Sequence, residues 1–182
     1  METVYVFLAT GFEEIEAVAT VDTLRRGNVI VKIISVTGKK DVEGAHGIVV
    51  KADGLFDETD FSDAAMLVLP GGMPGTSNLN AHGALKQLLS EFSMQNKPIA
   101  AICAAPLVLG GLKMLDEKKA VCYPGFETQL GNAKFVNAPT VIDGKIITAK
   151  GPGFTIDFGL AIVEFLKGKK VSDEVANGLL VK

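Results

Sequence analysis

The sequence predicts an α/β fold in which a mostly parallel sheet is covered by helices on both faces. Strand-like runs alternate with helical patterns along the chain, as in successive βαβ units. The first run, Val4–Ala9, is apolar at every position of the strand alternation, which is typical of a central strand in a parallel sheet. With 182 residues and 48% hydrophobic content, the chain is expected to form one domain, residues 1–182, with a large core.

The first helix is expected at Phe12–Gly27, because glutamates occupy its first turn, Arg25 and Arg26 its last, and a glycine follows. Asp143-Gly144 predicts a two-residue hairpin between two later strands. The other expected elements, in chain order, are strands at Val29–Val36, Ile48–Lys51 (in an edge hairpin) and Ala65–Leu69, one long helix within Gly75–Asn96, strands at Ile99–Ile102, Ala120–Tyr123, Thr140–Ile142 and Lys145–Thr148, and helices at Phe154–Lys167 and Ser172–Leu180.

Composition and charge exclude several classes of function. The net charge of −3 and the lack of a basic cluster give no case for nucleic-acid binding. No uncharged run is long enough to cross a membrane, and no signal peptide is recognisable. Cys103 and Cys122 form no CxxC pair, so we expect no disulfide framework, no zinc site and a reducing cytoplasm as the compartment. No other metal cluster is visible in the sequence.

The stretch from Pro98 to Leu112 has the pattern of a nucleophile elbow. An apolar strand ends at Cys103, and a small apolar helix with Pro106 in its first turn follows at once. The free N–H groups of a helix start favour thiolate over thiol, so the pattern predicts a lowered pKa for Cys103. The alternative is that Cys103 is a buried small hydrophobic residue, as most free cysteines are.

Two further features should lie at the same sheet edge, where ligands bind in parallel α/β sheets. The first is the Pro70–Gly72 turn, where the N–H of Gly72 could pair with that of Ala104 as an oxyanion hole. A tight turn without function is the alternative. The second is Glu16, which falls off the apolar arc of its helix and would by periodicity be solvated. It could assist a thiolate only if it were buried and protonated.

Four motifs occur in an order that resembles the ThiJ/PfpI family, in particular its parkinsonism-linked deglycase branch with bacterial members. They are GFEEIEAVATVDTLRRG, LPGGMPG, AAICAAP and TAKGPGFTIDFGLAIVEFL, and the likeness runs from Val4 to the last helix. The resemblance implies a flavodoxin-like three-layer α/β/α sandwich, similar to class I glutamine amidotransferases, and a homodimer. It implies that Cys103 is the elbow nucleophile, that Glu16 is a protonated carboxyl bonded to it, and that Gly72 and Ala104 form the oxyanion hole.

The resemblance also suggests further residues around the pocket: Gly71, Pro152 in the GPG turn, and Arg26 on the first helix. The chain departs from the family at two positions. Tyr123 stands where many members have a histidine, which argues against a mechanism that needs a histidine base. His46 stands in a loop where this branch often has an arginine, and in the family that loop approaches the partner subunit's site. The resemblance therefore suggests that His46 contributes to the pocket across the dimer; the alternative is an exposed loop histidine.

The resemblance implies a cofactor-free, cysteine-dependent glyoxalase or deglycase that acts on methylglyoxal, glyoxal or their early adducts on proteins and small molecules. The alternative is a redox-responsive stress protein or chaperone that senses peroxide through Cys103, with Cys122 either a resolving thiol or a packed strand residue. A third hypothesis is a cysteine peptidase or amidotransferase-like hydrolase, but the sequence lacks the histidine that such an enzyme is expected to have.

Overall fold

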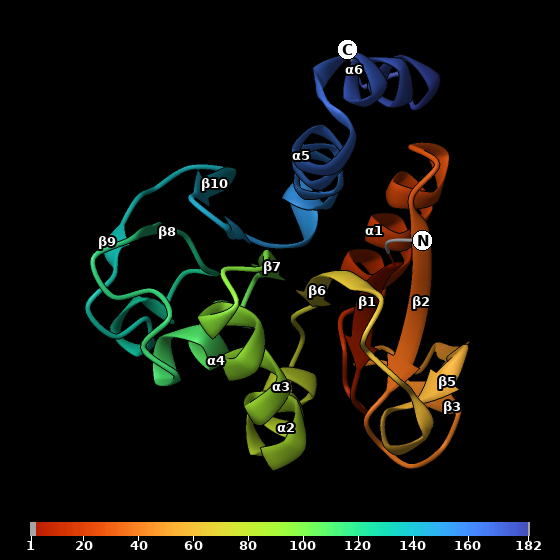
Figure 1. Cartoon of the computed structure of the whole chain (residues 1–182), viewed down its shortest axis with the longest axis vertical. Helices are drawn as coiled ribbons and strands as arrows, with labels where there is room; N and C mark the ends of the chain where they lie inside the picture. Colours follow the sequence, from red (N-terminus) through yellow and green to blue (C-terminus); the bar gives the residue numbers. More distant parts are fainter. Residues whose placement is uncertain (1–2, 182) are drawn as a thin grey trace.

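The computed structural model describes residues 3–181, and its centre is a seven-stranded sheet in the order β10-β11-β7-β6-β1-β2-β5 (Figure 1). All neighbours are parallel except the β10–β11 hairpin. This arrangement confirms the predicted mostly parallel sheet. The strands are β1 Thr3–Leu8, β2 Ile30–Ser35, β5 Gly54–Leu55, β6 Ala64–Leu69, β7 Ile99–Ile102, β10 Thr140–Asp143 and β11 Ile146–Ala149.

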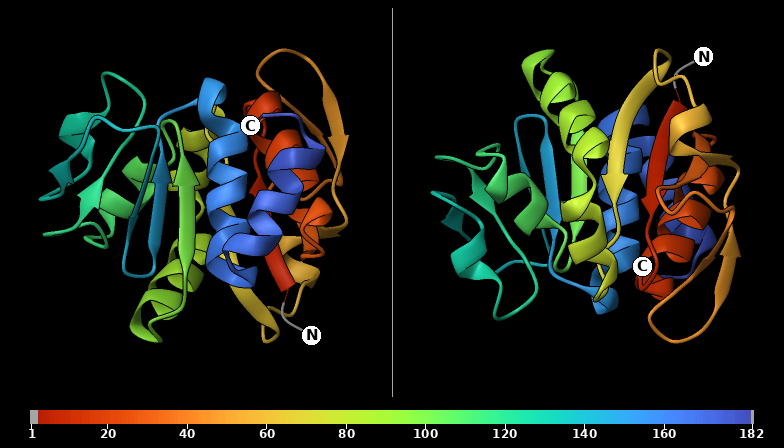
Figure 2. Two further views of the ribbon diagram at one scale, coloured as in Figure 1. Left: turned by 90° about the horizontal axis from the view of Figure 1, so that it is seen from above. Right: turned by 90° about the horizontal axis from the view of Figure 1, so that it is seen from below.

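Helices cover both faces of this sheet, which makes three layers (Figure 2). On one face α1 packs against α5 and α5 against α6, while α2, α3 and α4 lie on the other (Figure 1). Every residue of β1 is buried between the two layers, as expected for a central parallel strand. The helices are α1 Glu14–Arg26, α2 Gly75–Ala81, α3 Gly83–Met94, α4 Pro106–Gly111, α5 Thr155–Lys167 and α6 Lys169–Gly178, with 3₁₀ turns η1 Phe56–Glu58, η2 Glu127–Gln129 and η3 Pro152–Phe154.

The prediction of one long helix within residues 75–96 was wrong. The chain becomes extended at His82 (φ −79°, ψ 98°), so α2 ends there and α3 begins. The His82 ring explains the new start, because its Nδ1 accepts the N–H of Leu85 at 3.0 Å and caps α3.

Two small sheets lie outside the main one. The β3 (Asp41–Glu43) and β4 (Val49–Lys51) strands form the predicted hairpin, but as a separate antiparallel pair. The β8 (Lys119–Ala120) and β9 (Lys134–Phe135) strands form a short parallel pair. The strand predicted at residues 120–123 is therefore shorter than expected, and Cys122 and Tyr123 follow it in irregular backbone.

The strand order places the loops after β1, β6 and β7 side by side. The chain passes from β1 outward to β2 and later returns to β6 on the other side of β1, so the order reverses at this point of the sheet. Such a switch point is where open α/β sheets bind ligands. Glu16, Gly71 and Cys103 follow these three strands.

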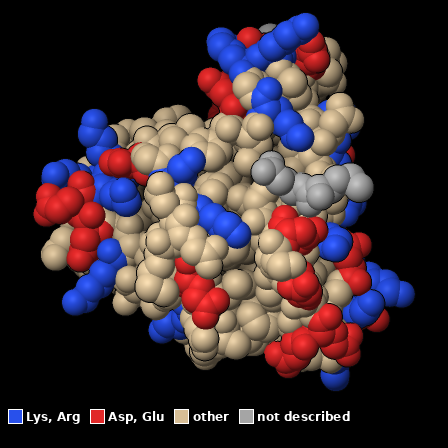
Figure 3. All heavy atoms as spheres, viewed as in Figure 1, with Lys and Arg blue, Asp and Glu red and all other residues tan. Residues whose placement is uncertain are grey.

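On the face shown in Figure 3, acidic and basic side chains are interspersed, and no continuous basic band covers it. Within residues 3–181, none of the helices has the length and apolar character needed to cross a membrane.

Candidate active site

Cys103 stands at the tip of a strained turn between β7 and α4. Its φ of +66° lies in the left-handed region that non-glycine residues rarely adopt. Backbone hydrogen bonds hold this geometry: the N–H of Cys103 donates to the carbonyl of Ala149 at 2.9 Å, and the N–H of Tyr123 donates to the carbonyl of Cys103 at 2.8 Å. Pro106 begins α4. The structure therefore has the strand–nucleophile–helix geometry that the sequence pattern predicts.

Glu16, in the first turn of α1, is completely buried. Its expected solvation was wrong, because the loop after β6 covers this turn: the N–H of Gly71 donates to Glu16 Oε2 at 2.7 Å. Gly71 also brings Glu16 to the cysteine. A Cβ added at Gly71 would lie 2.6 Å from Cβ of Cys103 and 2.7 Å from Glu16 Oε2, so only glycine lets the two side chains meet there.

Burial raises the pKa of Glu16 from 4.5 to about 7, against the opposing effects of hydrogen bonding with Cys103 and Gly71 and with a small contribution from the charge of Glu13. Near neutral pH this carboxyl therefore exists in both protonation states, as a group that gives and takes protons must.

The pKa of Cys103 is raised to about 12, chiefly by burial and next by the charge and the hydrogen bond of Glu16. The prediction of a lowered pKa for Cys103 was therefore wrong. The N–H groups at the helix start do lower this pKa, but burial and Glu16 raise it by more. Two of the three contributions that raise the pKa come from Glu16. Protonation of Glu16 removes its charge and turns its carboxyl into a donor, so the state of Glu16 controls the reactivity of the thiol.

The N–H groups of Gly72 and Ala104 interact with the Cys103 thiol and lower its pKa. Gly72 has a φ of +90°, and a Cβ there would overlap the backbone nitrogen of Glu13. The Gly72 donor is thus fixed by tight backbone packing, and the Ala104 donor is held by the hydrogen-bonded turn that follows Cys103. Donors fixed beside a nucleophile are suited to hold an oxyanion that forms on the atom it attacks.

The other predicted pocket residues divide into two groups. Tyr123 and Pro152 line a cavity of about 210 Å³ beside the elbow. Arg26 does not reach the site: it lies at the opposite end of α1 from Glu16 and pairs with Asp22 at 2.7 Å.

A model of the DJ-1/PfpI family matches residues 2–165 of the sequence. The chain belongs to the DJ-1/PfpI family. This result agrees with the resemblance seen in the four motifs, and the layered fold agrees with it as well.

Relatives and solved structures of this DJ-1/PfpI family cover nearly all of the chain. DJ-1beta of Drosophila melanogaster is 35% identical over 178 residues, which make up 97% of this chain and 95% of that protein. The glutathione-independent glyoxalase DJR-1.2 of Caenorhabditis elegans is 30% identical and covers 92% and 89%. The structure of oxidized DJ-1 from Toxoplasma gondii superposes with a TM-score of 0.94 at 36% identity, covering 99% and 98%.

Some relatives are longer than this DJ-1/PfpI chain. DJ-1 homolog A of Arabidopsis thaliana is 39% identical over 184 residues, and the match spans all of this chain but only 47% of that protein. The chain thus spans about half the length of this relative.

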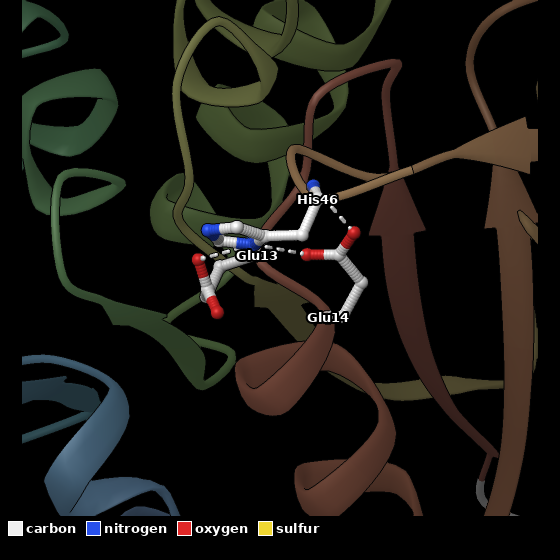
Figure 4. A group of neighbouring side chains, drawn as sticks. All are labelled: Glu13, Glu14 and His46. Atoms are coloured by element: carbon white, nitrogen blue, oxygen red, sulfur yellow. Dashed lines mark hydrogen bonds and ion pairs between the residues drawn. The ribbon is translucent and has the colours of Figure 1, made fainter. Parts of the chain in front are cut away.

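His46 lies on the turn between β3 and β4, where its ring stands between the carboxylates of Glu13 and Glu14 (Figure 4). Its Nδ1 is 2.8 Å from Glu14 Oε2 and 3.6 Å from Glu13 Oε2. One ligand atom from each of the three lies within 4.8 Å of the others, the one such group found in residues 3–181. Both oxygens of Glu14 already accept N–H donors, so we interpret the group as an ion pair.

Glu14 is the residue of this region that sequence reasoning missed. It looked like a surface glutamate that stabilises the helix dipole, yet it is 6% exposed. The available signal was Gly44, since a Cβ at that position would overlap the Glu14 carboxylate.

Cys122 is fully buried, and burial, with a contribution from Glu127, raises the pKa of its thiol to about 11. These features match a packed residue better than a resolving thiol.

Proposed function

We propose that the protein is a cofactor-free, glutathione-independent glyoxalase or deglycase of the DJ-1/PfpI family. The observation that carries the proposal is the buried contact between Cys103, at the strained elbow, and Glu16, whose pKa is near neutrality. A relative that is 30% identical is named a glutathione-independent glyoxalase, which supports the same class of reaction. The substrates would be methylglyoxal, glyoxal or their early adducts on amines and thiols.

In the first step, the sulfur of Cys103 attacks the aldehyde carbon of methylglyoxal, and the carbonyl electron pair moves to oxygen. Ionised Glu16 takes the thiol proton as the S–C bond forms. The N–H groups of Gly72 and Ala104 stabilise the oxyanion until Glu16 returns the proton to it, which gives a hemithioacetal.

In the second step, Glu16 removes the proton from the former aldehyde carbon and delivers it to the neighbouring carbonyl carbon. The hydroxyl proton of the hemithioacetal passes to the oxygen of that neighbouring carbon. The product is a thioester of lactate on Cys103. Water then cleaves the S–C bond and restores the thiol, so the sum is methylglyoxal and water to lactic acid. No redox partner is needed because one carbon is oxidised and its neighbour reduced.

A peptidase-like mechanism is less well supported, because both histidines of the sequence are engaged elsewhere. His82 caps α3 and packs edge-on against Phe56, and His46 pairs with Glu14. Glu16 is therefore the group that contacts Cys103 and can move its proton.

The test is lactate formation from methylglyoxal without glutathione by the purified protein, its Cys103→Ala variant and its Cys122→Ala variant. The proposal predicts turnover by the wild type and by Cys122→Ala, and none above background by Cys103→Ala. Equal lactate formation by wild type and Cys103→Ala would refute it.

A second function, peroxide sensing, has one specific observation in its favour. The N–H groups of Gly72 and Ala104 that interact with the sulfur could also bond the oxygens of a sulfinate, and a similar DJ-1 structure is of the oxidized protein. Peroxide titration with peptide mass spectrometry tests it. Selective oxidation of Cys103, without turnover of any dicarbonyl, would favour sensing over catalysis.

We also propose that the chain forms a homodimer. Supporting this, α1 and the neighbouring hairpin turn expose four large apolar side chains, each about half or more exposed: Ile15, Val18, Ile48 and Val49. Analytical ultracentrifugation of the wild type and an Ile15→Glu, Ile48→Glu variant tests this, and a wild type that sediments as a monomer would contradict it.

A further inference from the structure

Glu14 is the first residue of α1, and its side chain is buried. Its carboxylate nevertheless accepts several hydrogen bonds from N–H groups. Oε1 accepts the backbone N–H of His46 at 2.7 Å and, more weakly, that of Ile48 at 3.4 Å. Oε2 lies 2.8 Å from Nδ1 of the His46 ring. Burial alone would raise the pKa of Glu14, but these bonds and one from its own N–H outweigh burial and lower it. Glu14 therefore stays ionised and holds the β3–β4 turn.

The same turn contacts the segment Gly11–Glu14, which connects β1 to α1. The N–H of Gly11 donates to the carbonyl of Glu43 at 2.8 Å, and the N–H of Ala45 donates to the carbonyl of Phe12 at 2.8 Å. Together with the Glu14 carboxylate, these bonds fix the turn along one side of the segment.

The loop after β6 contacts the other side of this segment. The N–H of Glu13 donates to the carbonyl of Gly71 at 2.9 Å, and the N–H of Gly75 donates to the carbonyl of Gly11 at 3.0 Å. The segment is therefore held between the β3–β4 turn and the loop that carries the oxyanion donor Gly72.

The turn packs closely against the segment, because a Cβ at Gly44 in the turn would overlap the Glu14 carboxylate. Glu16 follows two residues later, and its Oε1 is buried without a hydrogen-bond partner. The turn is linked to Glu16 through the loop after β6: the carbonyl of Gly71 accepts the N–H of Glu13, and the N–H of Gly71 donates to Glu16 Oε2.

We propose that Glu14 is a positioning residue: by binding the backbone of His46 and Ile48 and the His46 ring, it keeps the β3–β4 turn on the start of α1 and so keeps Glu16 buried against Cys103. Its importance for turnover rests on the proposed function. The burial of Glu16 can be measured without any turnover, so the two proposals can fail separately.

If the turn releases the start of α1, the bonds from Glu13 to Gly71 and from Gly71 to Glu16 should loosen and admit water to Glu16. Because burial is what raises the pKa of Glu16 to about 7, the value should then fall toward 4.5. The other titratable groups that act on Glu16 are Cys103, across the site, and Glu13, at the N-cap of α1, and both remain in the variant. Removing the charge of Glu14 could itself lower the pKa of Glu16, so a neutral variant that keeps the acceptor oxygen is the proper comparison.

The experiment is a ¹³C NMR titration of protein labelled at the glutamate side-chain carboxyl carbons, with the Glu16 signal assigned by its absence in Glu16→Gln. In Glu14→Gln, the amide oxygen still accepts the His46 and Ile48 N–H groups, and the pKa of Glu16 should stay within about 0.5 of wild type. In Glu14→Ala it should fall by about 1 or more. Equal values in the two variants, or no fall in Glu14→Ala, would overturn the proposal.

If Glu14→Ala does not fold, the decision passes to His46→Ala, whose side chain is 67% exposed and whose backbone N–H remains. Loss of the ring donor should lower the pKa of Glu16 by more than about 0.5, and a value within that range of wild type would then overturn the proposal. Glu91→Gln, an exposed position on α3, controls for the loss of a carboxylate. A wild type without turnover but with the predicted shifts would refute the glyoxalase proposal and leave Glu14 as a positioning residue.

Discussion

Replacing Glu16 by glutamine should make the stability of the protein less dependent on pH. The folded state keeps Glu16 protonated up to about pH 7, whereas the ordinary pKa of 4.5 applies after unfolding. Between these values the folded state binds more protons than the unfolded state, so the free energy of unfolding falls as pH rises through this window. Glutamine is neutral at every pH and can still accept the N–H of Gly71.

The magnitude follows from the two pKa values. The difference between 4.5 and about 7, at about 1.36 kcal/mol for each pKa unit, corresponds to about 3 kcal/mol. We therefore expect Glu16→Gln and wild type to have similar stability at pH 4.5. At pH 8 the variant should be more stable by about 3 kcal/mol, because only the wild type then holds a buried carboxylate.

Urea denaturation followed by far-UV circular dichroism at several pH values between 4.5 and 8 measures this difference. Other titrating groups contribute equally to both proteins and cancel in the comparison. The Glu91→Gln variant should show no pH-dependent difference from wild type. A constant difference between Glu16→Gln and wild type across the range would refute the assignment of a buried, protonated carboxyl to Glu16.

Three further predictions follow from the same geometry. In Gly71→Ala, the new methyl group would lie less than 3 Å from Cβ of Cys103 and Oε2 of Glu16. Thermal melting should therefore show a free energy of unfolding lower by about 1–3 kcal/mol, and assays should show little or no methylglyoxal turnover. In Gly72→Ala, the strained φ and the overlap of the new methyl group with the backbone of Glu13 should displace the oxyanion donor and lower kcat by about 10²–10³-fold. An unchanged kcat would exclude this donor. Iodoacetamide should alkylate the buried Cys122 only when the protein unfolds. Peptide mass spectrometry after labelling with and without urea measures this, and rapid labelling of Cys122 in the native protein would contradict its buried position.

The elements that the sequence predicted well depend on local signals. The strand before Cys103, the proline after it and the Asp143-Gly144 hairpin are each determined by a few adjacent residues, and the structure confirms them. The resemblance to a family, and not periodicity, placed Glu16 beside the cysteine.

The errors concern contacts between distant parts of the chain. Glu16 is buried by Gly71, 55 residues away, so the helical pattern of α1 alone predicted solvent. Glu14 is buried by the His46 turn, 32 residues away. The break between α2 and α3 depends on the ring of His82, which caps α3 although histidine is not among the residues preferred at an N-cap.

The central claim is that Cys103 forms the bond to the carbonyl carbon of the substrate and that Glu16 transfers the protons. The most direct test is ¹³C NMR of labelled methylglyoxal mixed with an excess of wild type, Glu16→Gln or Cys103→Ala. The account predicts lactate with the wild type, and neither lactate nor a hemithioacetal signal in Cys103→Ala. In Glu16→Gln a hemithioacetal signal should appear without lactate, because loss of the Glu16 charge lowers the pKa of the thiol and water can take its proton in the first step. Lactate formation by Glu16→Gln at the wild-type rate would contradict it.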